Sequence, residues 1–266
     1  MNLESAKSFK NKTVLITGAT GPMGIAFSGM FASMGAKLIL TDIDIKKGAA
    51  LVSKINKESE TTAKFVAMNL EKEEERSKGC KLIAESVESL DVLINNAALT
   101  GDSEVEDYVA LFSDQSDLSF SRALTVNLLA PFSIVRNLLP LLEKSSTASI
   151  INIASIYGLV GSVPTLYGKS GLRTPAAYAA SKGGLIQLTR YLATSLAPKI
   201  RVNAIAPGGI ERNQDAKFIE AYASRTPLGR MATEQDICGA VRWLASSESS
   251  YVTGQVVAVD GGWTAW

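Results

Sequence analysis

A tyrosine and a lysine at helical spacing carry the first chemical signal in this chain. Tyr178 and Lys182 stand four positions apart in the segment YAASK, so on a helix both side chains would share one face. A phenol, whose ordinary pKa is about 10, becomes a useful base near neutral pH only when a nearby cation favours its ionised form. Of the three tyrosines between Ser155 and Lys182, only Tyr178 has a cation at this spacing. We therefore expect Tyr178 to transfer a proton, and Tyr157 and Tyr167 to be loop or pocket residues.

The composition excludes several other kinds of chemistry. The 266 residues include no histidine, which removes His-based catalytic triads and most catalytic zinc sites. The two cysteines, Cys80 and Cys238, are too far apart in the sequence to indicate a metal cluster or a disulfide framework, so we expect no metal. Lys plus Arg at 27 against Asp plus Glu at 26 gives no basic excess, and we expect no nucleic-acid partner.

The sequence also gives little sign of membrane association. Its most apolar region, residues 123–142, is interrupted by polar residues and by Pro140, and we interpret it as a buried core helix rather than a membrane span. The first twelve residues contain no apolar stretch of the kind found in signal peptides. We expect no membrane partner and a cytoplasmic location.

Short apolar runs alternate with longer amphipathic stretches along the chain. The runs are rich in Val and Ile without strict polar alternation, which is typical of strands buried on both faces of a sheet. They begin at Thr13, Ala36, Ala63, Asp91, Ser149, Ile200 and Val256. The helix-length stretches between them are Met23–Met34, Ile45–Ser59, Glu71–Ser89, Leu118–Glu143, Pro175–Ala197 and Glu234–Ser246. This alternation predicts an α/β fold with a single domain over residues 1–266, built as a Rossmann-type doubly wound parallel sheet flanked by helices on both faces.

Two long irregular segments interrupt this alternation. Residues 100–118 are polar and acidic, and residues 156–175 are rich in Gly, Ser and Pro. Each follows the carboxyl end of a predicted strand, which is where open α/β sheets bind their ligands. We predict that both are substrate loops, with tolerated surface insertions as the alternative.

The first predicted strand leads directly into a glycine-rich turn. In TVLITGATGPMG, the residues Gly18, Gly21 and Gly24 precede a helix pattern, which allows a pyrophosphate to approach the backbone at the helix N-terminus. Asp42 ends the second predicted strand, where its carboxylate would accept hydrogen bonds from the adenosine ribose and repel a 2′-phosphate. Because the glycine turn contains no arginine, these residues favour NAD over NADP as the cofactor.

These features together resemble the short-chain dehydrogenase/reductase family in its single-domain form, over almost the whole chain. The resemblance rests on residues 17–24, NNAA at Asn95–Ala98, Asn127, Ser155, YAASK from Tyr178, PGG at Pro207–Gly209 and VTGQVVAVDGG from Val252. It implies an enzyme that transfers hydride between a nicotinamide cofactor and a secondary alcohol or ketone.

The resemblance also implies roles for individual residues. Asn127, Ser155, Tyr178 and Lys182 would form the catalytic set. The charges of Lys182 and of the oxidised nicotinamide would together lower the pKa of Tyr178. Lys182 would also bind the nicotinamide ribose, while Ser155 would hydrogen-bond the substrate oxygen. Asn127 would hold a water behind the lysine. The implied cofactor contacts are Gly18, Thr20, Gly21, Met23, Gly24, Asp42, Asn69, Leu70, Asn96, Ala97, Tyr178, Lys182, Pro207, Gly208 and Ile210.

Several positions depart from the family pattern. Pro22 stands where a glycine is often found, and Asn69 replaces the usual aspartate after the third strand. Arg212 occupies the place of a threonine that would touch the nicotinamide carboxamide, and would instead place a guanidinium near an anionic substrate. Ser155 and Tyr178 are separated by more residues than usual, so extra chain must extend over the substrate pocket.

The substrate hypothesis rests on finer similarity. The long Ser155–Tyr178 segment and the VDGGWTAW ending look most like a bacterial subgroup associated with flagellin modification and legionaminic-type sugar pathways. A hydroxyl on a phosphorylated or amino sugar is therefore the leading substrate, with Lys169, Arg173 and Arg212 either as phosphate contacts or as solvated surface charges. A 3-oxoacyl-[acyl-carrier-protein] reductase and a non-catalytic NAD-binding sensor are the alternatives. Helix pairing in the family implies a homodimer or homotetramer.

Overall fold

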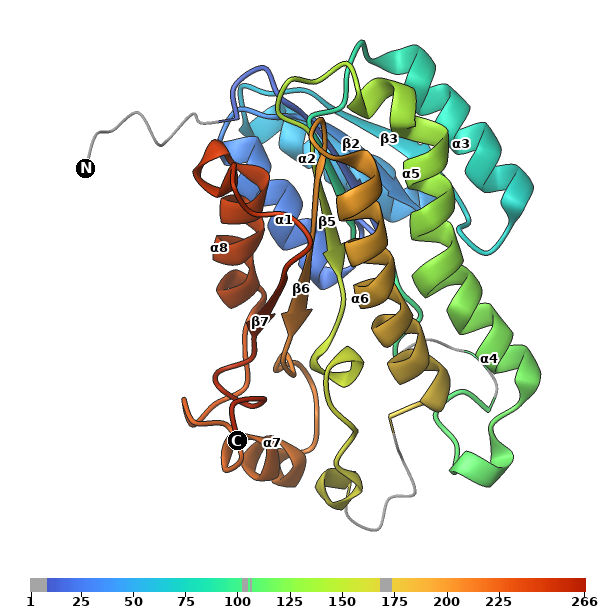
Figure 1. Ribbon diagram of the computed structural model, residues 1–266, viewed down its shortest axis with the longest axis vertical. Coiled ribbons are helices and arrows are strands. Elements are labelled where there is room, and N and C mark those ends of the chain that lie inside the picture. Colours follow the sequence, from blue (N-terminus) through green and yellow to red (C-terminus); the bar gives the residue numbers. More distant parts are fainter. Residues whose placement is uncertain (1–8, 102–104, 106, 168–173) are drawn as a thin grey trace.

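Seven parallel strands form one sheet in the described part of the chain, in the order β3-β2-β1-β4-β5-β6-β7 (Figure 1). The computed structural model describes residues 9–101, 105, 107–167 and 174–266. The strands are β1 (Thr13–Thr17), β2 (Lys37–Asp42), β3 (Ala63–Ala67), β4 (Val92–Asn95), β5 (Ser149–Ile153), β6 (Arg201–Pro207) and β7 (Val256–Val259). The chain reverses its direction of winding between β1 and β4, and the predicted doubly wound sheet is confirmed.

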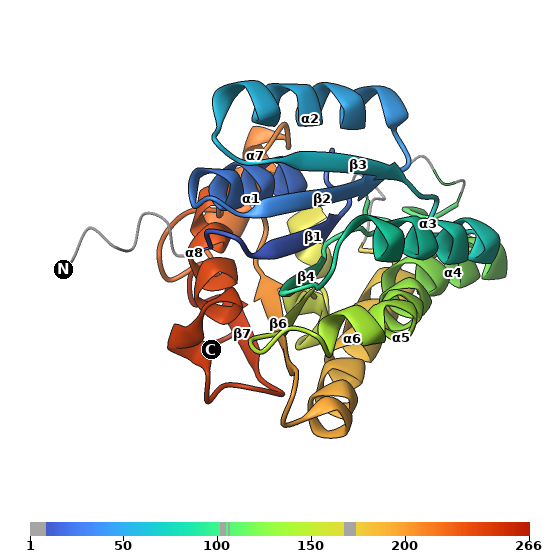
Figure 2. The ribbon, with the colours of Figure 1, turned by 90° about the horizontal axis from the view of Figure 1, so that it is seen from above.

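Helices cover both faces of the sheet (Figure 2). One face carries α1 (Pro22–Ser33), α2 (Ile45–Glu58) and α8 (Glu234–Ala245). The other carries α3 (Glu73–Ser86), α5 (Ala130–Leu142) and α6 (Ala176–Leu196). Because both faces are covered, every residue of β1, β4 and β5 is buried, which explains the unbroken apolar runs in the sequence.

The apolar region between β4 and β5 differs from the single helix predicted over Leu118–Glu143. It divides into α4 (Asp117–Leu124), a π-helical turn (Thr125–Leu129) and α5. Among the described residues, the combined stretch is the one helix long and apolar enough to cross a membrane, but half of its most apolar window is buried inside the protein. This burial fits the core helix that the sequence predicts. The π-helical turn matters for the site because it carries the buried Asn127.

A helix that the sequence analysis did not predict follows β6. This helix, α7 (Ala216–Ala223), lies beyond the carboxyl ends of the strands, together with the 3₁₀ turns Ile156–Gly158 and Pro164–Tyr167 (Figure 1). Asp215 caps α7 by accepting a hydrogen bond from the backbone of Lys217 at 2.9 Å. The short turns and α7 together cover the edge of the sheet at which ligands of this fold bind.

The two predicted substrate loops both lie at this edge and are described only in part. Tyr167 of the second loop packs on Phe218 of α7, with 5.5 Å between the ring centroids. Lys169 and Arg173, proposed from the sequence as phosphate contacts, lie outside the described residues.

Candidate active site

In the glycine turn after β1, Gly18 and Gly24 pack tightly against neighbouring backbone, whereas Gly21 has open space beside it. Gly18 has a φ of +63°, and a Cβ atom there would lie 2.7 Å from the Cα of Ala97. A Cβ on Gly24 would lie 2.2 Å from the carbonyl oxygen of Gly18, so the first turn of α1 packs directly on the glycine turn. A Cβ on Gly21 would meet only that same carbonyl, at 3.5 Å. Gly21 therefore marks the open side of the turn, where another group can approach the backbone.

The N-terminus of α1 suits an anionic ligand. Gly21 occupies the N-cap position, and it supplies no side chain to bind the first backbone N–H groups of the helix. Pro22 stands at the first helical position, where its missing N–H is tolerated, and Met23 follows. An uncapped helix N-terminus beside an open glycine matches the pyrophosphate site predicted from the sequence.

The side chains of Thr17 and Asn96 hold this turn against β4. From the sequence, Asn96 is predicted only as a cofactor contact, and Thr17 has no predicted role of its own. The Thr17 hydroxyl accepts hydrogen bonds from the backbone N–H groups of Asn96 and Ala97, both at 3.0 Å. The Asn96 amide donates in return to the carbonyls of Thr17 (2.9 Å) and Gly18 (3.0 Å). The NNAA segment thus fixes the glycine turn. The position of Thr17, directly before the first glycine, is the sequence signal that identifies it.

Asp42 lies beside the glycine turn, as predicted. Its carboxylate is half-buried and accepts hydrogen bonds from the backbone N–H groups of Thr20 at 2.9 Å and Ile43 at 2.7 Å. On the neighbouring strand, the side-chain oxygen of Asn69 accepts from the backbone of Glu71 at 2.9 Å, which fixes the turn into Leu70. The end of β2 and the end of β3 therefore present the positions expected to bind adenosine.

A cavity of about 850 Å³ opens at the carboxyl ends of the central strands. Ser155, Tyr178 and Lys182 line it together, although they come from a 3₁₀ turn and from α6. Tyr157 and Tyr167 also line it, which confirms them as pocket residues. Besides Tyr178 and Lys182, five further predicted cofactor contacts share the same lining: Met23, Asn96, Pro207, Gly208 and Ile210. One cavity is therefore lined both by candidate catalytic groups and by residues predicted to contact the cofactor.

Lys182 is almost completely buried, with 2% of its surface exposed. Its ammonium donates a hydrogen bond to the carbonyl oxygen of Ile153 at 2.7 Å and lies 5.6 Å from the centroid of the Tyr178 ring. Burial disfavours the charged form and lowers the pKa of Lys182 to about 7. The lysine is thus next to the tyrosine, as helical spacing predicts, but its charge is not fixed at neutral pH.

In the protein alone the pKa of Tyr178 lies above its ordinary value, and the lowering expected from Lys182 together with the oxidised nicotinamide stays a prediction. Burial raises the pKa of Tyr178, and this outweighs a hydrogen bond from Ser155 and the charge of Arg212, which both lower it. Desolvation acts on both the phenol and the ammonium, and the spacing of Tyr178 and Lys182 in the sequence does not record it. The resemblance implies a second positive charge beside the phenol, that of the oxidised nicotinamide, which would favour the phenolate.

Ser155 and Asn127 are held by the backbone. The Ser155 hydroxyl oxygen accepts from the backbone N–H of Tyr157 at 3.2 Å, which leaves its own proton available to donate. The Asn127 side chain accepts from the N–H of Leu99 at 2.7 Å and donates to the carbonyl of Leu99 at 3.1 Å and to the hydroxyl of Ser181 at 3.0 Å. Asn127 therefore braces the chain after β4 against α6 and does not itself line the cavity.

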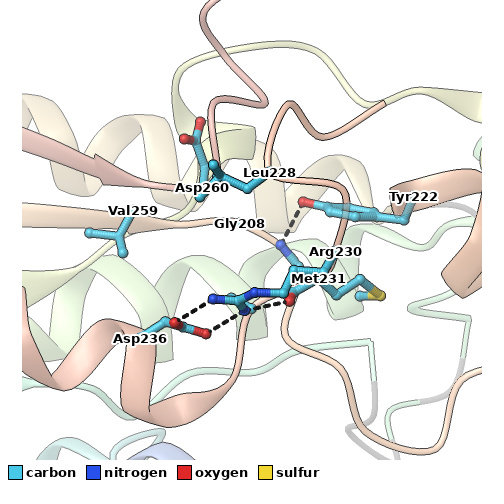
Figure 3. A pocket seen from close by; sticks show the side chains of 11 residues that line it. Gly208, Tyr222, Leu228, Arg230, Met231, Asp236, Val259 and Asp260 are labelled. Carbon is cyan, nitrogen blue, oxygen red and sulfur yellow. Dashed lines mark hydrogen bonds and ion pairs between the residues drawn. The ribbon is translucent and has the colours of Figure 1, made fainter. Parts of the chain in front are cut away.

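A smaller pocket of about 150 Å³ shares Gly208 and Gly209 of the PGG turn with the large cavity (Figure 3). Tyr222 of α7 contributes to the walls of both, and its hydroxyl accepts a hydrogen bond from the backbone of Gly209 at 2.6 Å. A Cβ on Gly209 would lie 2.8 Å from the Tyr222 ring, which itself stacks on Trp263 at 4.2 Å. Tyr222 is therefore a positioning residue for this turn. The sequence analysis missed it because it did not predict α7.

Arg212 also lines the large cavity. Its Nε atom donates to a carboxylate oxygen of Glu234 at 3.2 Å, and 34% of its side chain is exposed. Tyr178 lines the same cavity, and the charge of the guanidinium lowers the pKa of this phenol.

The burial of Lys182 predicts that the protein becomes more stable as the pH rises from about 7. In the unfolded chain the lysine pKa returns to about 10.5, so above pH 7 the unfolded state binds more protons than the folded state. The free energy of unfolding should therefore increase by up to ~1.4 kcal/mol per pH unit. The buried thiols of Cys80 and Cys238, with pKa values raised to about 11, act in the opposite direction only above their ordinary value of 9.0.

Urea unfolding at pH 7 and at pH 9 checks this prediction. The lower limit is the pKa of Lys182 in the folded protein, and the upper limit is the ordinary pKa of a thiol, 9.0. The variant Lys182→Met should lose most of the pH dependence. Lys199→Met, which removes an exposed lysine paired with Glu143, should keep it. A wild-type stability that does not change over this window would contradict the buried position of the Lys182 ammonium.

Comparisons with known proteins agree with this geometry. The family model described as Enoyl-(Acyl carrier protein) reductase matches residues 18–264. The 3-oxoacyl-[acyl-carrier-protein] reductase of Aquifex aeolicus is 34% identical over 258 residues, which are 95% of this chain and 97% of that protein. A gluconate 5-dehydrogenase from Burkholderia cenocepacia, solved in complex with NADP and tartrate, matches with a TM-score of 0.86 and 26% identity over 100% of both chains. A short chain dehydrogenase from Leptospira borgpetersenii with bound NAD+ matches with a TM-score of 0.83 and 32% identity, over 99% of this chain and 96% of that one.

The sequence alignment and the structural matches both extend over nearly the full length of this chain and of its relatives. Both solved structures carry a nicotinamide cofactor. The chain belongs to the short-chain dehydrogenase/reductase family and is an oxidoreductase that acts on CH–OH groups with a nicotinamide cofactor.

Proposed function

We propose that the chain is an NAD-preferring enzyme that interconverts a secondary alcohol and a ketone in the cavity lined by Ser155, Tyr178 and Lys182. The observation that carries this proposal is the meeting of these three side chains in one cavity with Met23, which follows the glycine-rich turn, and with the PGG turn. When bound, the oxidised nicotinamide supplies the acceptor for the hydride from the carbinol carbon and a positive charge near the phenol.

The protein's own groups manage the proton and the substrate oxygen. In the oxidative direction, the Tyr178 phenolate accepts the hydroxyl proton, while the C–O single bond becomes a carbonyl. Ser155 donates its hydroxyl proton in a hydrogen bond to the same oxygen and stabilises the charge that develops there. Lys182 contributes a positive charge beside the ring and fixes the end of β5 through Ile153. In the reductive direction, Tyr178 donates the proton.

The preference for NAD rests on Asp42. Its carboxylate lies at the glycine turn through its bond with Thr20, where it would accept from ribose hydroxyls and repel a 2′-phosphate. Lys47, a nearby cation that would favour NADP, is paired with Asp44 at 3.4 Å. The solved relatives carry either cofactor, so the charge at this position is the feature that supports NAD.

Replacing Asp42 by asparagine should reduce the preference for NAD by about tenfold or more, because a charge repulsion of roughly 1.4 kcal/mol or more is lost. The ratio of kcat/KM for NAD and NADP measures this preference. Asp44→Asn removes a charge two positions away that faces Lys47, and should leave the ratio within about twofold. An unchanged ratio in Asp42→Asn would show that another group selects the cofactor.

Separate observations support two substrate classes, a 3-oxoacyl thioester and a sugar or sugar acid. The similarity to a 3-oxoacyl-[acyl-carrier-protein] reductase supports a 3-oxoacyl thioester more directly than the sugar-pathway substrate favoured by the sequence. The second class, a sugar or sugar acid, is supported by Arg212 and the tyrosine hydroxyls in the cavity, and by the similarity to a gluconate 5-dehydrogenase.

Assays of NADH formation or consumption with 3-oxoacyl thioesters, sugar phosphates and hydroxy acids test the proposal. Turnover of members of one class identifies the substrate. Tight NAD binding without turnover of any secondary alcohol or ketone would overturn the proposal in favour of a sensor.

A further inference from the structure

Arg212 lines the cavity at a position where the family resemblance implies a threonine. The threonine expected there is uncharged, and the guanidinium therefore changes the chemistry of the cavity wall. The charged residues that line the described cavity are Lys182, Arg212, Asp215 and Lys217. They give an excess of cations.

The backbone that carries Arg212 is firmly held. The side chain of Gln214 accepts a hydrogen bond from the Arg212 N–H at 2.7 Å and donates to the carbonyl of Ile210 at 2.9 Å. Glu211 is in turn bonded through its N–H to the carbonyl of Ala232 at 2.8 Å. These contacts hold Arg212 at a fixed place directly after the PGG turn, so it projects from a defined position rather than from a loose loop.

The ion pair with Glu234 orients the side chain. Glu234 is the first residue of α8, and it engages the Nε edge of the guanidinium at 3.2 Å. A guanidinium has a planar fork of five N–H donors, which matches two oxygens of a carboxylate or phosphate. Its Nε edge is bound to Glu234, and the side chain lines the same cavity as Tyr178 and Ser155.

We propose that Arg212 binds an anionic group of the substrate, a carboxylate or a phosphate, close to the hydroxyl that reacts at Tyr178. The proposal rests on the proposed function, since it narrows the substrate of the same site to anionic secondary alcohols and their ketones. The hydroxyls of Tyr157, Tyr167 and Thr174 line the same cavity and suit a substrate with further polar groups.

Kinetics with matched pairs of compounds test this assignment in the full-length protein. Each anionic compound is paired with a neutral counterpart: hydroxy acids with their methyl esters, and sugar phosphates with the parent sugars. In Arg212→Gln, the KM of the anionic member should rise by roughly 10- to 100-fold, because a charge-assisted hydrogen bond is lost, while the neutral member changes by less than about threefold. Arg212→Lys should restore part of the loss. The pair that responds distinguishes a carboxylate from a phosphate.

Arg230→Gln is the matched control. Arg230 also forms an ion pair with α8, with Asp236 at 2.7 Å, but it lines the small pocket and not the large cavity (Figure 3). If Arg212 acted only on stability, Arg212→Gln would raise the KM of the anionic and the neutral compound of each pair equally. That result would overturn the proposal.

Calorimetric titration measures anion binding directly, so it tests the role of Arg212 without depending on turnover. Malate and inorganic phosphate are titrated into the protein saturated with NAD, with dimethyl malate as the neutral probe. Wild type should bind at least one anion, and Arg212→Gln should lose that binding by about tenfold or more, whereas Arg230→Gln should keep it. Failure of all turnover would overturn the proposed function. Anion binding that is absent, or unchanged in Arg212→Gln, would overturn the assignment of Arg212.

Discussion

Replacing Tyr178 by phenylalanine is expected to lower kcat by about a thousandfold, because positioned proton transfer contributes roughly 10²- to 10⁴-fold to such reactions. The phenyl ring keeps the volume and the packing beside Lys182, so folding and NAD binding should remain close to wild type. Steady-state turnover with an accepted substrate, together with calorimetric titration of NAD, measures both effects.

Tyr167→Phe is the matched control for this prediction. Its hydroxyl lies in the same cavity and is hydrogen-bonded to Thr174 at 2.8 Å, but it has no cation beside it at helical spacing. This variant should keep kcat within about an order of magnitude, as expected for loss of a single neutral hydrogen bond. Wild-type turnover in Tyr178→Phe, or an equal loss in both variants, would show that Tyr178 is not the proton-transfer group.

Gly18→Ala is expected to damage both stability and cofactor binding. The residue has a φ of +63°, which costs a non-glycine residue about 1–2 kcal/mol. The added Cβ would also lie 2.7 Å from the Cα of Ala97, a backbone atom that cannot move aside without displacing the NNAA segment. We expect the free energy of unfolding to fall by about 2 kcal/mol or more, and the affinity for NAD to fall by about tenfold or more.

Gly29→Ala provides the control on the following helix. Gly29 is exposed within α1, and a Cβ there would meet no atom within 4 Å. Alanine should raise helix stability by about 0.5–1 kcal/mol and leave NAD affinity unchanged. Urea unfolding and NAD titration of the two variants give the comparison. If Gly18→Ala bound NAD as wild type does, the close packing of the turn on Ala97 would not be needed for the cofactor site.

The strands could be predicted from the sequence because burial on both faces demands unbroken apolar runs. Val14 to Ile16 in β1 and Ile150 to Ile151 in β5 are fully buried, and their sequence shows it without any tertiary information. The helix α7 could not be predicted in this way. It is short, begins with the local cap of Asp215, and packs on residues distant in the sequence such as Tyr167.

The site could be predicted as a set of residues but not as an electrostatic environment. Helical spacing places Lys182 beside Tyr178, and the structure agrees. Their pKa values depend on how much of the surrounding protein excludes water, which no local pattern records, and burial moves both away from the charged forms. The bonds of Asn127 with Leu99 and Ser181 likewise join three separate segments of the chain.

Direct transfer of hydrogen from the substrate carbon is the central claim, and isotope labelling tests it. A substrate accepted in the assays is prepared with deuterium on the carbinol carbon and oxidised by the wild-type enzyme in ordinary water. Mass spectrometry of the reduced cofactor should then find one deuterium per molecule formed, with Tyr178→Phe giving almost no labelled product in the same time. Reduced cofactor without deuterium would contradict hydride transfer in this cavity.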